Sequence, residues 1–364
     1  MTPRFHPLRI ADIRAEAPDA VSMCFEVPPP LAEEYRFVEG QHLTLRAHLD
    51  GEELRRSYSI CSAPADGELR IAIKAVPGGR FSHWAVSELK PGDAVDVMTP
   101  EGRFHALLDP AHPNHYVAFA AGSGITPVLS LIRSRLAEEP QARFTLVYGN
   151  RSPDAVMFHE ALEDLKDRYM ARFALYHVFS RQPQETALFN GRIDRARTRA
   201  LLDSLIPAAG IDAAFVCGPA SMIDEVEAAL LDAGVPAARI HAERFGAPRA
   251  GAQPVPEPQM EESAPGAKVE LAARIAVTID GLRREFDFKP GQHSILEAGL
   301  AAGLELPFSC RAGMCCTCRA RLLEGEVRMR RQFALEPADL AAHFVLACQA
   351  YPLTPRVALS FDDR

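Results

Sequence analysis

The sequence predicts a multidomain chain with an N-terminal β-barrel, a central α/β domain built on a parallel sheet, and a separate C-terminal domain. Three observations indicate this fold class. Short alternating strands fill residues 1–108, and strand and helix patterns alternate over residues 109–246. A stretch rich in Pro, Gly, Ala and Glu, residues 247–268, then separates both from residues 269–364.

The first domain is expected to be all-β apart from one helix at residues 81–89. Apolar and polar residues alternate over short segments, and Gly, Pro and Asp turns separate these segments. Many short strands of this kind indicate a barrel or a sandwich. The expected strands include residues 21–27, 42–49, 54–60, 69–76 and 94–98.

In the second domain, apolar strand-like runs alternate with amphipathic helical stretches, which is typical of a parallel sheet flanked by helices. The last helix should end at Gly234, because glycine tolerates the left-handed conformation that closes many helices. The expected strands are residues 116–120, 144–148, 173–179, 214–217 and 240–242, and the expected helices are residues 126–137, 154–167, 194–205 and 221–233.

Residues 247–268 have no apolar periodicity, so they cannot bury enough surface to offset the entropy lost on ordering. We expect an extended, mobile tether between the second domain and the third.

Composition and charge narrow the class of partner. The net charge of −8 disfavours nucleic acid and anionic membranes. No stretch approaches the roughly 18 consecutive apolar residues that span a bilayer, and residues 1–7 lack the apolar region of a secretory signal. We therefore expect a cytoplasmic protein whose eight cysteines are mostly thiols or metal ligands.

Four cysteines have the spacing of a plant-type [2Fe–2S] cluster. They follow C-x4-C-x2-C with a fourth 30 positions further on: Cys310, Cys315, Cys318 and Cys348. The alternative is a structural zinc site, but zinc sites favour two close pairs and two of these cysteines are isolated. Cys316 suits neither spacing and is expected to be a bystander.

The predicted strand at residues 54–60 carries a cation beside an aromatic residue. Alternation places Arg56, Tyr58 and Ile60 on one face and Ser59 on the other. Such a face can bind a pyrophosphate and stack on a flat ring, although an ordinary exposed strand is an equal alternative.

Gly78 and Gly79 lead into the single helix expected in the first domain. A glycine turn before a helix N-terminus favours an anion, through free N–H groups and the helix dipole. The alternative is a plain helix capped by Ser82.

A second glycine turn, Gly122 to Gly124, follows a buried strand and opens a helix that begins with Thr126 and Pro127. This context suits phosphate binding. The pattern is not G-x-G-x-x-G, because Pro127 replaces the third glycine, but proline fits a first helical turn. A plain strand–turn–helix is the alternative.

Together these segments resemble the ferredoxin–NADP reductase superfamily, whose FAD domain has R-x-Y-S and G-x-x-S/T elements in this order. The resemblance implies that Arg56 binds the FAD pyrophosphate, Tyr58 stacks on the flavin and Ser59 lies near flavin N5. The remaining expected FAD contacts are Ile60, Gly78, Gly79 and Ser82.

For residues 109–246 the resemblance implies an NAD(P)-binding domain in which Cys217 and Glu243 flank the hydride-transfer site and Phe245 lies against the flavin. The alternative for Cys217 is that it is simply a buried apolar residue with no role in hydride transfer. The expected catalytic residues are Ser59, Cys217 and Glu243, and the expected nucleotide contacts are Gly122, Gly124, Thr126, Pro127, Gly218 and Pro219.

The choice of nucleotide depends on groups near the adenosine ribose. The predicted strand ends offer Arg151, Ser180 and Arg181 and no acidic residue, so a 2′-phosphate is favoured over a free 2′-hydroxyl. We expect NADPH as the nucleotide. The alternative is that the arginines are ordinary solvated surface residues and that the nucleotide is NADH.

Residues 269–364 resemble plant-type ferredoxins through residues 296–315, which end in LPFSCRAGMC. The resemblance implies an α+β domain of the β-grasp type with its cluster near the surface. The domain has 12 Lys and Arg against 12 Asp and Glu, unlike the acidic photosynthetic ferredoxins. Six arginines flank the ligands, which suggests a basic docking surface for an acidic partner: Arg311, Arg319, Arg321, Arg328, Arg330 and Arg331.

The domain order implies a relay from NADPH through FAD and the [2Fe–2S] cluster to an external oxygenase. The YGNR and SFDDR segments resemble reductase subunits of phenylacetyl-CoA epoxidases, which implies a di-iron hydroxylase complex as partner. The alternatives are the reductase of a Rieske-type oxygenase, such as steroid 9α-hydroxylase, and a non-catalytic redox sensor.

Overall fold

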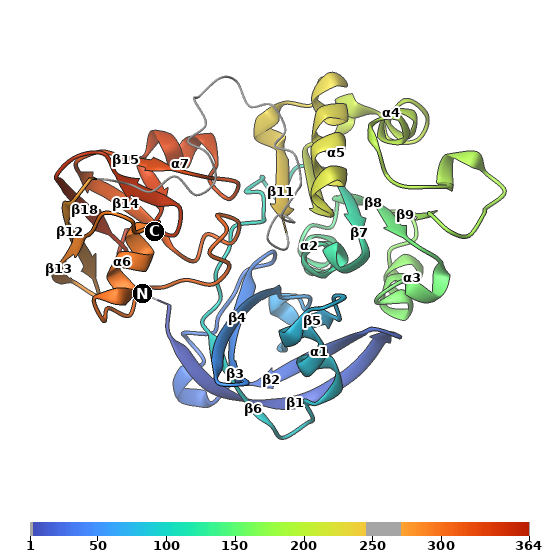
Figure 1. Cartoon of the computed structure of the whole chain (residues 1–364). Coiled ribbons are helices and arrows are strands. Elements are labelled where there is room, and N and C mark those ends of the chain that lie inside the picture. The colour runs from blue at the N-terminus through green and yellow to red at the C-terminus, as the bar shows by residue number, and fades with distance from the viewer. Residues whose placement is uncertain (1–2, 245–270, 364) are drawn as a thin grey trace. The chain divides into compact units, whose positions relative to one another are not determined.

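The computed structural model describes residues 3–244 and 271–363. The chain forms two compact units, Phe5–Phe245 and a second made of Gly246–Arg364 with Met1–Arg4. Figure 1 shows the elements of both units and labels most of them. The tether predicted at residues 247–268 lies outside the described residues. In the described part of the chain, no helix is long and apolar enough to cross a membrane.

The first sheet of the Phe5–Phe245 unit is an antiparallel barrel, as predicted, with strand order β4-β3-β6-β1-β2-β5. An Ile60–Ile71 bridge and a hydrogen bond from the Cys61 amide to the Arg70 carbonyl (2.8 Å) connect the two ends of this order, which closes the sheet. The elements are β1 (Phe5–Ala17), β2 (Ala20–Glu26), β3 (His42–Leu49), β4 (Glu52–Ser59), β5 (Leu69–Lys74), α1 (Arg80–Ser87) and β6 (Ala94–Met98).

The longest barrel strand, β1, was not predicted. Its pairing with β2 shifts register between Ile10 and Asp12 and again between Ala15 and Ala17. Each irregularity breaks the alternation of apolar and polar residues, so a search for a period of two misses the strand.

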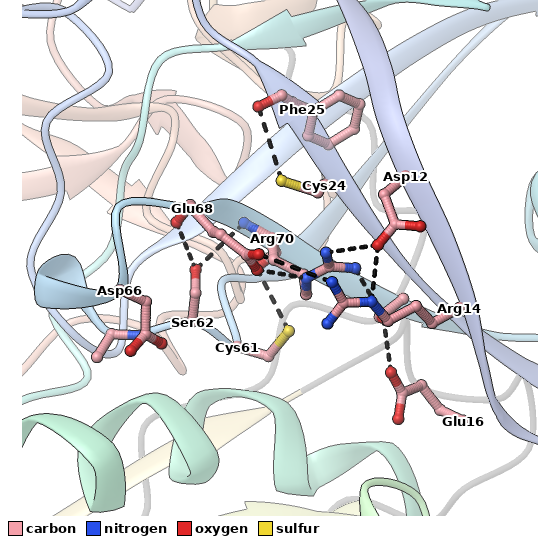
Figure 2. Close-up of polar contacts among 12 residues, drawn as sticks. Asp12, Arg14, Glu16, Cys24, Phe25, Cys61, Ser62, Asp66, Glu68 and Arg70 are labelled. Carbon is pink, nitrogen blue, oxygen red and sulfur yellow. Dashed lines mark hydrogen bonds and ion pairs between the residues drawn. The ribbon is translucent and has the colours of Figure 1, made fainter. Parts of the chain in front are cut away.

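A buried arginine ties three barrel strands together. Arg70 of β5 donates to Asp12 of β1 (2.8 Å), to Glu68 (2.8 Å) and to Ser22 of β2 (3.2 Å). Figure 2 shows the Asp12 and Glu68 carboxylates beside its guanidinium. Because the Arg70 side chain is only 7% exposed, these partners are needed to satisfy its charge, and they fix β1, β2 and β5 against one another.

The second sheet of this unit is parallel, in the order β11-β10-β7-β8-β9. It confirms the predicted α/β fold, and Gly234 follows the last helix with a φ of +87°. The elements are β7 (His115–Ala121), α2 (Ile125–Glu138), β8 (Arg143–Asn150), α3 (His159–Arg168), β9 (Phe173–Phe179), α4 (Arg195–Ser204), β10 (Ala213–Gly218), α5 (Ala220–Asp232) and β11 (Ile240–Arg244).

One predicted helix boundary was wrong, because α3 begins at His159 and not at residue 154. Pro153–Ala155 form a separate 3-10 turn. Phe158 then adopts a φ of +58°, which an α-helix cannot contain, so the helix starts only after it.

Helix α2 attaches the parallel sheet to the barrel. Ser130 donates its hydroxyl to the Ser62 carbonyl (2.7 Å), and Arg133 forms an ion pair with Asp66 (2.8 Å). Both barrel partners lie in the segment that follows β4. The segment after β4 therefore connects two expected sites. It continues the strand that carries Tyr58, and it is bonded to α2, the helix that follows the Gly122–Gly124 turn.

Arg135 is the centre of a buried polar cluster between α2 and the barrel. It forms ion pairs with Glu39 of the barrel and with Glu139 (3.0 Å), and it donates to the Ala106 carbonyl (3.1 Å). Glu139 also accepts a hydrogen bond from Tyr116 of β7 (2.9 Å). The cluster links the central strand of the parallel sheet to the barrel.

The second unit contains the predicted α+β fold. Its main sheet has the order β13-β12-β18-β14-β16, in which β12 and β18 are parallel and the other neighbours antiparallel, and β15 pairs with β17. Its apolar core is separate from those of the first unit. The elements are β12 (Ala273–Ile279), β13 (Leu282–Phe288), α6 (Ile295–Ala301), β14 (Arg319–Glu324), β15 (Val327–Met329), α7 (Pro337–Ala341), β16 (Phe344–Leu346), β17 (Ala350–Pro352) and β18 (Arg356–Ser360).

Candidate functional site

The fold brings Ser59 and Glu243 into contact although 184 positions separate them. Ser59 ends β4 of the barrel, Glu243 lies on β11, and the Ser59 hydroxyl donates to the Glu243 carboxylate at 2.9 Å. Cys217 lies beside Glu243, because β10 and β11 pair in register at these residues. The three predicted catalytic residues therefore meet where the barrel adjoins the carboxyl ends of two parallel strands.

Burial changes how these groups hold protons. It raises the pKa of Glu243 to about 7, and the hydrogen bond from Ser59 opposes part of that rise. Burial also raises the pKa of the Cys217 thiol well above its ordinary value, and the neighbouring Glu243 carboxylate adds to this effect. Cys217 is therefore a neutral thiol, whereas Glu243 can hold or release a proton near neutral pH.

The solvent exposure of alternate residues decreases along the end of β4 and into Ile60, the residue that follows it. Arg56 is exposed, Tyr58 is half-buried and Ile60 is fully buried. The Tyr58 ring lies 6.0 Å from the ring of Phe81 in α1, and Phe81 contacts Trp84 edge-on at 5.3 Å. An aromatic ring supported by a second ring, close to an exposed guanidinium, is a suitable wall for a flat anionic cofactor.

The Gly78–Gly79 turn opens α1 as predicted, but Ser82 does not cap the helix. Gly79 is the N-cap, and the Ser82 hydroxyl accepts from the Val76 amide (3.1 Å) and donates to the Gly79 carbonyl (3.2 Å). Gly78 has a φ of +75° and open space where a Cβ would lie. Ser82 thus shapes the turn, and the first amides of α1 are left for an anion.

On the other face of this strand pair, the face that carries Ser59, one buried nitrogen has no hydrogen-bond partner within the described residues, namely Nε2 of His42. His42 of β3 pairs in register with Ser59 of β4. Burial lowers the pKa of His42 to about 4, so its ring is neutral. An unpaired buried polar atom is unfavourable, and a cofactor with a hydrogen-bonding edge would satisfy it. These residues fit a flavin dinucleotide.

Two glycines let the turn after β7 pack against the end of β10. A Cβ on Gly124 would lie 2.1 Å from the Cys217 carbonyl oxygen, and one on Gly218 would lie 3.2 Å from the Cβ of Ala121, at the end of β7. Gly122 differs, since it has a φ of +53° and open space at the Cβ position. The Gly122 side of the turn can therefore admit a phosphate close to the backbone.

The other expected nucleotide contacts lie around this turn. Thr126 and Pro127 are buried in the first turn of α2, where Thr126 donates to the Ser123 carbonyl (3.0 Å), and Pro219 is exposed before α5. Sequence reasoning missed Tyr148, whose hydroxyl donates to the Gly122 carbonyl at 2.9 Å and holds the turn. No sequence pattern marks that contact. Phe245 lies outside the described residues.

Arg151 and Arg181 meet at the ends of neighbouring strands. The Arg181 amide donates to the Arg151 carbonyl (2.9 Å), and the Ser180 amide donates to the Asn150 carbonyl (3.0 Å). Both arginines and Ser180 are exposed. Because β8 lies next to β7, both arginines follow strands that end at the same edge of the sheet as the glycine turn, and exposed arginines at this edge suit a phosphate.

The four predicted cluster ligands come together as two pairs of thiols. Cys310 is hydrogen-bonded to Cys315 and Cys318 to Cys348, which lowers the pKa of Cys310 and Cys348 and raises the pKa of their partners. Two pairs match a cluster of two irons held by four thiolates. Across residues 3–244 and 271–363, no group of three or more His, Cys, Asp or Glu side chains is placed to hold a single metal ion.

The ligand loop supports this arrangement. The amides of Ala312 and Met314 donate to the Cys310 sulfur, at 3.4 Å each. The Cys316 thiol turns away and donates to the Ala334 carbonyl at 2.8 Å, in keeping with a bystander. Such N–H···S contacts stabilise thiolates that bind iron.

The sequence suggested that six arginines near the ligands form one basic docking surface. This expectation was wrong for Arg319. It forms an ion pair with Asp339 (3.0 Å) and lies 3.4 Å over the Phe344 ring, and its side chain is only 12% exposed. Arg321 is exposed on β14 of the main sheet.

Models of three domain families match the chain. An oxidoreductase FAD-binding domain matches residues 7–106, an oxidoreductase NAD-binding domain matches residues 119–228, and a 2Fe-2S iron–sulfur cluster binding domain matches residues 277–353. The matches follow the same order as the three predicted domains.

Proteins with similar sequences match this chain over nearly its whole length. The chain is 44% identical to a component of the 1,2-phenylacetyl-CoA epoxidase of Escherichia coli, over 99% of this chain and 98% of the relative. It is 33% identical to the 3-ketosteroid-9-alpha-monooxygenase ferredoxin reductase component of Mycolicibacterium smegmatis, over 98% of this chain and 97% of the relative. The solved structure of phthalate dioxygenase reductase is 25% identical, covers 98% of both chains and has a TM-score of 0.57.

The fold and its sites define an NAD(P)H-dependent oxidoreductase that transfers electrons through a flavin and an iron–sulfur centre. When bound, FAD takes a hydride from NAD(P)H and the [2Fe–2S] cluster carries single electrons. The chain belongs to the family of oxygenase reductases that join an FAD-binding, an NAD-binding and a [2Fe–2S] domain in one polypeptide. Members of this family act with an oxygenase component.

Proposed function

We propose that this chain is the NADPH-dependent reductase component of a phenylacetyl-CoA epoxidase in aerobic phenylacetate degradation, and that its acceptor is a di-iron oxygenase. The contact between Ser59 and Glu243 beside Cys217 carries the reductase part of the proposal. The 44% identity to the Escherichia coli epoxidase component, over nearly the whole of both chains, supports the choice of oxygenase.

The division of labour follows the three predicted domains, residues 1–108, 109–246 and 269–364, with residues 247–268 as the tether. In this proposal Arg56 and the Gly78–Gly79 turn hold the FAD phosphates, and Tyr58 covers the flavin ring. Glu243 and Ser59 hold a proton at the hydride-transfer site. Glu243 is suited to this role because burial raises its pKa to about 7.

NADPH is the proposed electron donor. Arg151 and Arg181 stand side by side at the sheet edge and both are exposed, so they can pair with a 2′-phosphate through charge-assisted hydrogen bonds.

Reconstitution tests the proposal. The purified reductase, loaded with FAD and iron–sulfur cluster, is combined with candidate oxygenase components of the epoxidase, NADPH and phenylacetyl-CoA, and the epoxide is measured by mass spectrometry. The proposal predicts NADPH-dependent epoxide. If the reductase supports only a steroid 9α-hydroxylase oxygenase, the alternative favoured by the Mycolicibacterium smegmatis relative replaces it.

A further inference from the structure

The ligand loop, which carries three of the four cluster ligands, has no backbone ladder to hold it. Residues 302–318, which the structure describes throughout, form neither helix nor strand between α6 and β14. Arg311, Gly313 and Cys316 adopt the left-handed conformation, with φ of +52°, +77° and +56°. Because this conformation is uncommon for residues other than glycine, the shape of the loop depends on contacts with other parts of the domain.

One of these contacts comes from Gln349, the residue that follows the fourth ligand. Its side-chain nitrogen donates to the Arg311 carbonyl (2.9 Å), and it also contacts the carbonyl (3.1 Å) and the sulfur (3.5 Å) of Cys348. Carbonyl oxygens and thiolates only accept hydrogen bonds, so the nitrogen of this amide must face them, and not its oxygen. A single side chain therefore joins the ligand loop to the ligand that lies farthest from it in sequence.

Packing leaves the Gln349 side chain little freedom. Gln349 is only 7% exposed. A Cβ on Gly313 would lie 3.1 Å from the Cγ of Gln349, so the side chain packs directly against the backbone of the ligand loop. The backbone of Gln349 is fixed as well, since its amide donates to the Leu346 carbonyl (2.8 Å) and its carbonyl accepts from the Arg330 amide (3.2 Å). The N–H groups of the side chain are thus held in place before an electron arrives.

Both pairs of ligands have a sulfur that accepts hydrogen bonds. In one pair, the amides of Ala312 and Met314 donate to the Cys310 sulfur, at 3.4 Å each. Those donors are backbone groups, whereas the donor to Cys348 is a side chain, which a substitution can remove. Hydrogen bonds to the sulfurs are one of the means by which a protein sets the reduction potential of an iron–sulfur cluster.

We propose that Gln349 is a positioning residue for the [2Fe–2S] cluster, which holds an N–H group against the Cys348 sulfur and thereby raises the reduction potential of the cluster. Reduction brings one electron from the flavin and adds one negative charge to the irons and their ligands. A donor that faces a thiolate stabilises this more negative state. The inference concerns the [2Fe–2S] domain itself and holds for any oxygenase that accepts the electron.

Substitutions in the full-length, cofactor-loaded protein test the proposal. Gln349→Met keeps the length of the side chain and removes its N–H groups, and Gln349→Glu keeps its shape but places a carboxylate beside the sulfur. Gln332→Met is the matched control, because Gln332 is exposed in another segment of the same domain. Iron per chain is measured first, and the reduction potential is then measured by a redox titration followed by EPR spectroscopy.

Gln349→Met should shift the equilibrium towards the oxidised cluster about threefold to tenfold, which lowers the potential by about 30–60 mV for one electron. Gln349→Glu should lower the potential at least as far, whereas Gln332→Met should shift the equilibrium less than about twofold, or about 20 mV. The proposal is overturned if the two Gln349 variants retain their iron and keep the potential of the wild type.

A measurement on the wild type decides the case in which neither Gln349 variant retains its iron. When only the side-chain nitrogens of glutamine are labelled with ¹⁵N, pulsed EPR of the reduced cluster should detect a coupled ¹⁵N nucleus, because the Gln349 nitrogen lies 3.5 Å from a ligand sulfur. The signal should persist in Gln332→Met. Its absence from the wild type, or its loss in Gln332→Met, would contradict the assigned role of Gln349.

Discussion

Replacing Arg135 with methionine should strongly destabilise the Phe5–Phe245 unit. Methionine keeps the aliphatic stem of the arginine but removes the charge that Glu39 and Glu139 share. It also leaves the Ala106 carbonyl without the hydrogen bond that Arg135 donates.

The magnitude follows from burial. The side chains of Arg135, Glu39 and Glu139 are 12%, 10% and 1% exposed, so removing the cation leaves two carboxylates with little access to water. Breaking a buried ion pair from one side costs about 3–5 kcal/mol. Arg133 on the same helix is the matched control, because it and Asp66 are 34% and 32% exposed and such pairs contribute about 0–1 kcal/mol.

Urea unfolding of the FAD-loaded protein, followed by tryptophan fluorescence, measures this difference. Trp84 in α1 is the chain's single tryptophan, so its emission reports on the barrel. Arg135→Met should lower the free energy of unfolding by about 3–5 kcal/mol and Arg133→Met by less than about 1 kcal/mol. Adding Glu139→Gln to Arg135→Met should recover about 1–2 kcal/mol, since one uncompensated carboxylate is removed. Equal losses in the two single variants would refute this reasoning.

Three further predictions concern the sites. Glu243 binds its proton more tightly in the folded protein than in the unfolded chain, because burial raises its pKa from 4.5 to about 7. The stability of the wild type relative to Glu243→Gln should therefore fall by up to about 3 kcal/mol as the pH rises from about 5 to about 8, and a difference independent of pH would contradict the buried environment. Arg181→Ala should weaken NADPH binding by about 1.5–3 kcal/mol and leave NADH nearly unchanged in titrations, whereas equal losses would place Arg181 outside the phosphate site. Cys348→Ser should lose iron or hold it weakly in metal analysis, while Cys316→Ser should keep two irons per chain; zinc without iron in the wild type would end the cluster assignment.

The fold class of the first two domains could be predicted from sequence because they follow different hydrophobic periods, whereas that of residues 269–364 came from the resemblance to plant-type ferredoxins. The failures have local causes. The register shifts in β1 hide its alternation, and the left-handed Phe158 delays the start of α3. Neither feature leaves a mark in the pattern of residue types.

The site could be predicted only in part. The cysteine spacing is local and identifies the ligands, but the contact of Ser59 with Glu243 depends on how the barrel meets the parallel sheet, so resemblance alone could suggest it. Arg135 has the sequence context of an exposed helix residue, and its burial follows from the packing of α2 on the barrel. Arg319 similarly counts as a surface charge until α7 brings Asp339 to it.

The central claim is that electrons reach the oxygenase only through the [2Fe–2S] domain, and a chain that ends at residue 246 tests it most directly. This chain keeps Ser59, Cys217 and Glu243 and the apolar cores of the first unit. It should bind FAD and reduce ferricyanide with NADPH at a rate close to that of the full protein. It should not drive the oxygenase, and residues 269–364 added as a separate protein should restore part of the rate, because the effective concentration that the tether provides is lost. Full oxygenase turnover by the shortened chain alone would make the flavin the direct donor and contradict the relay.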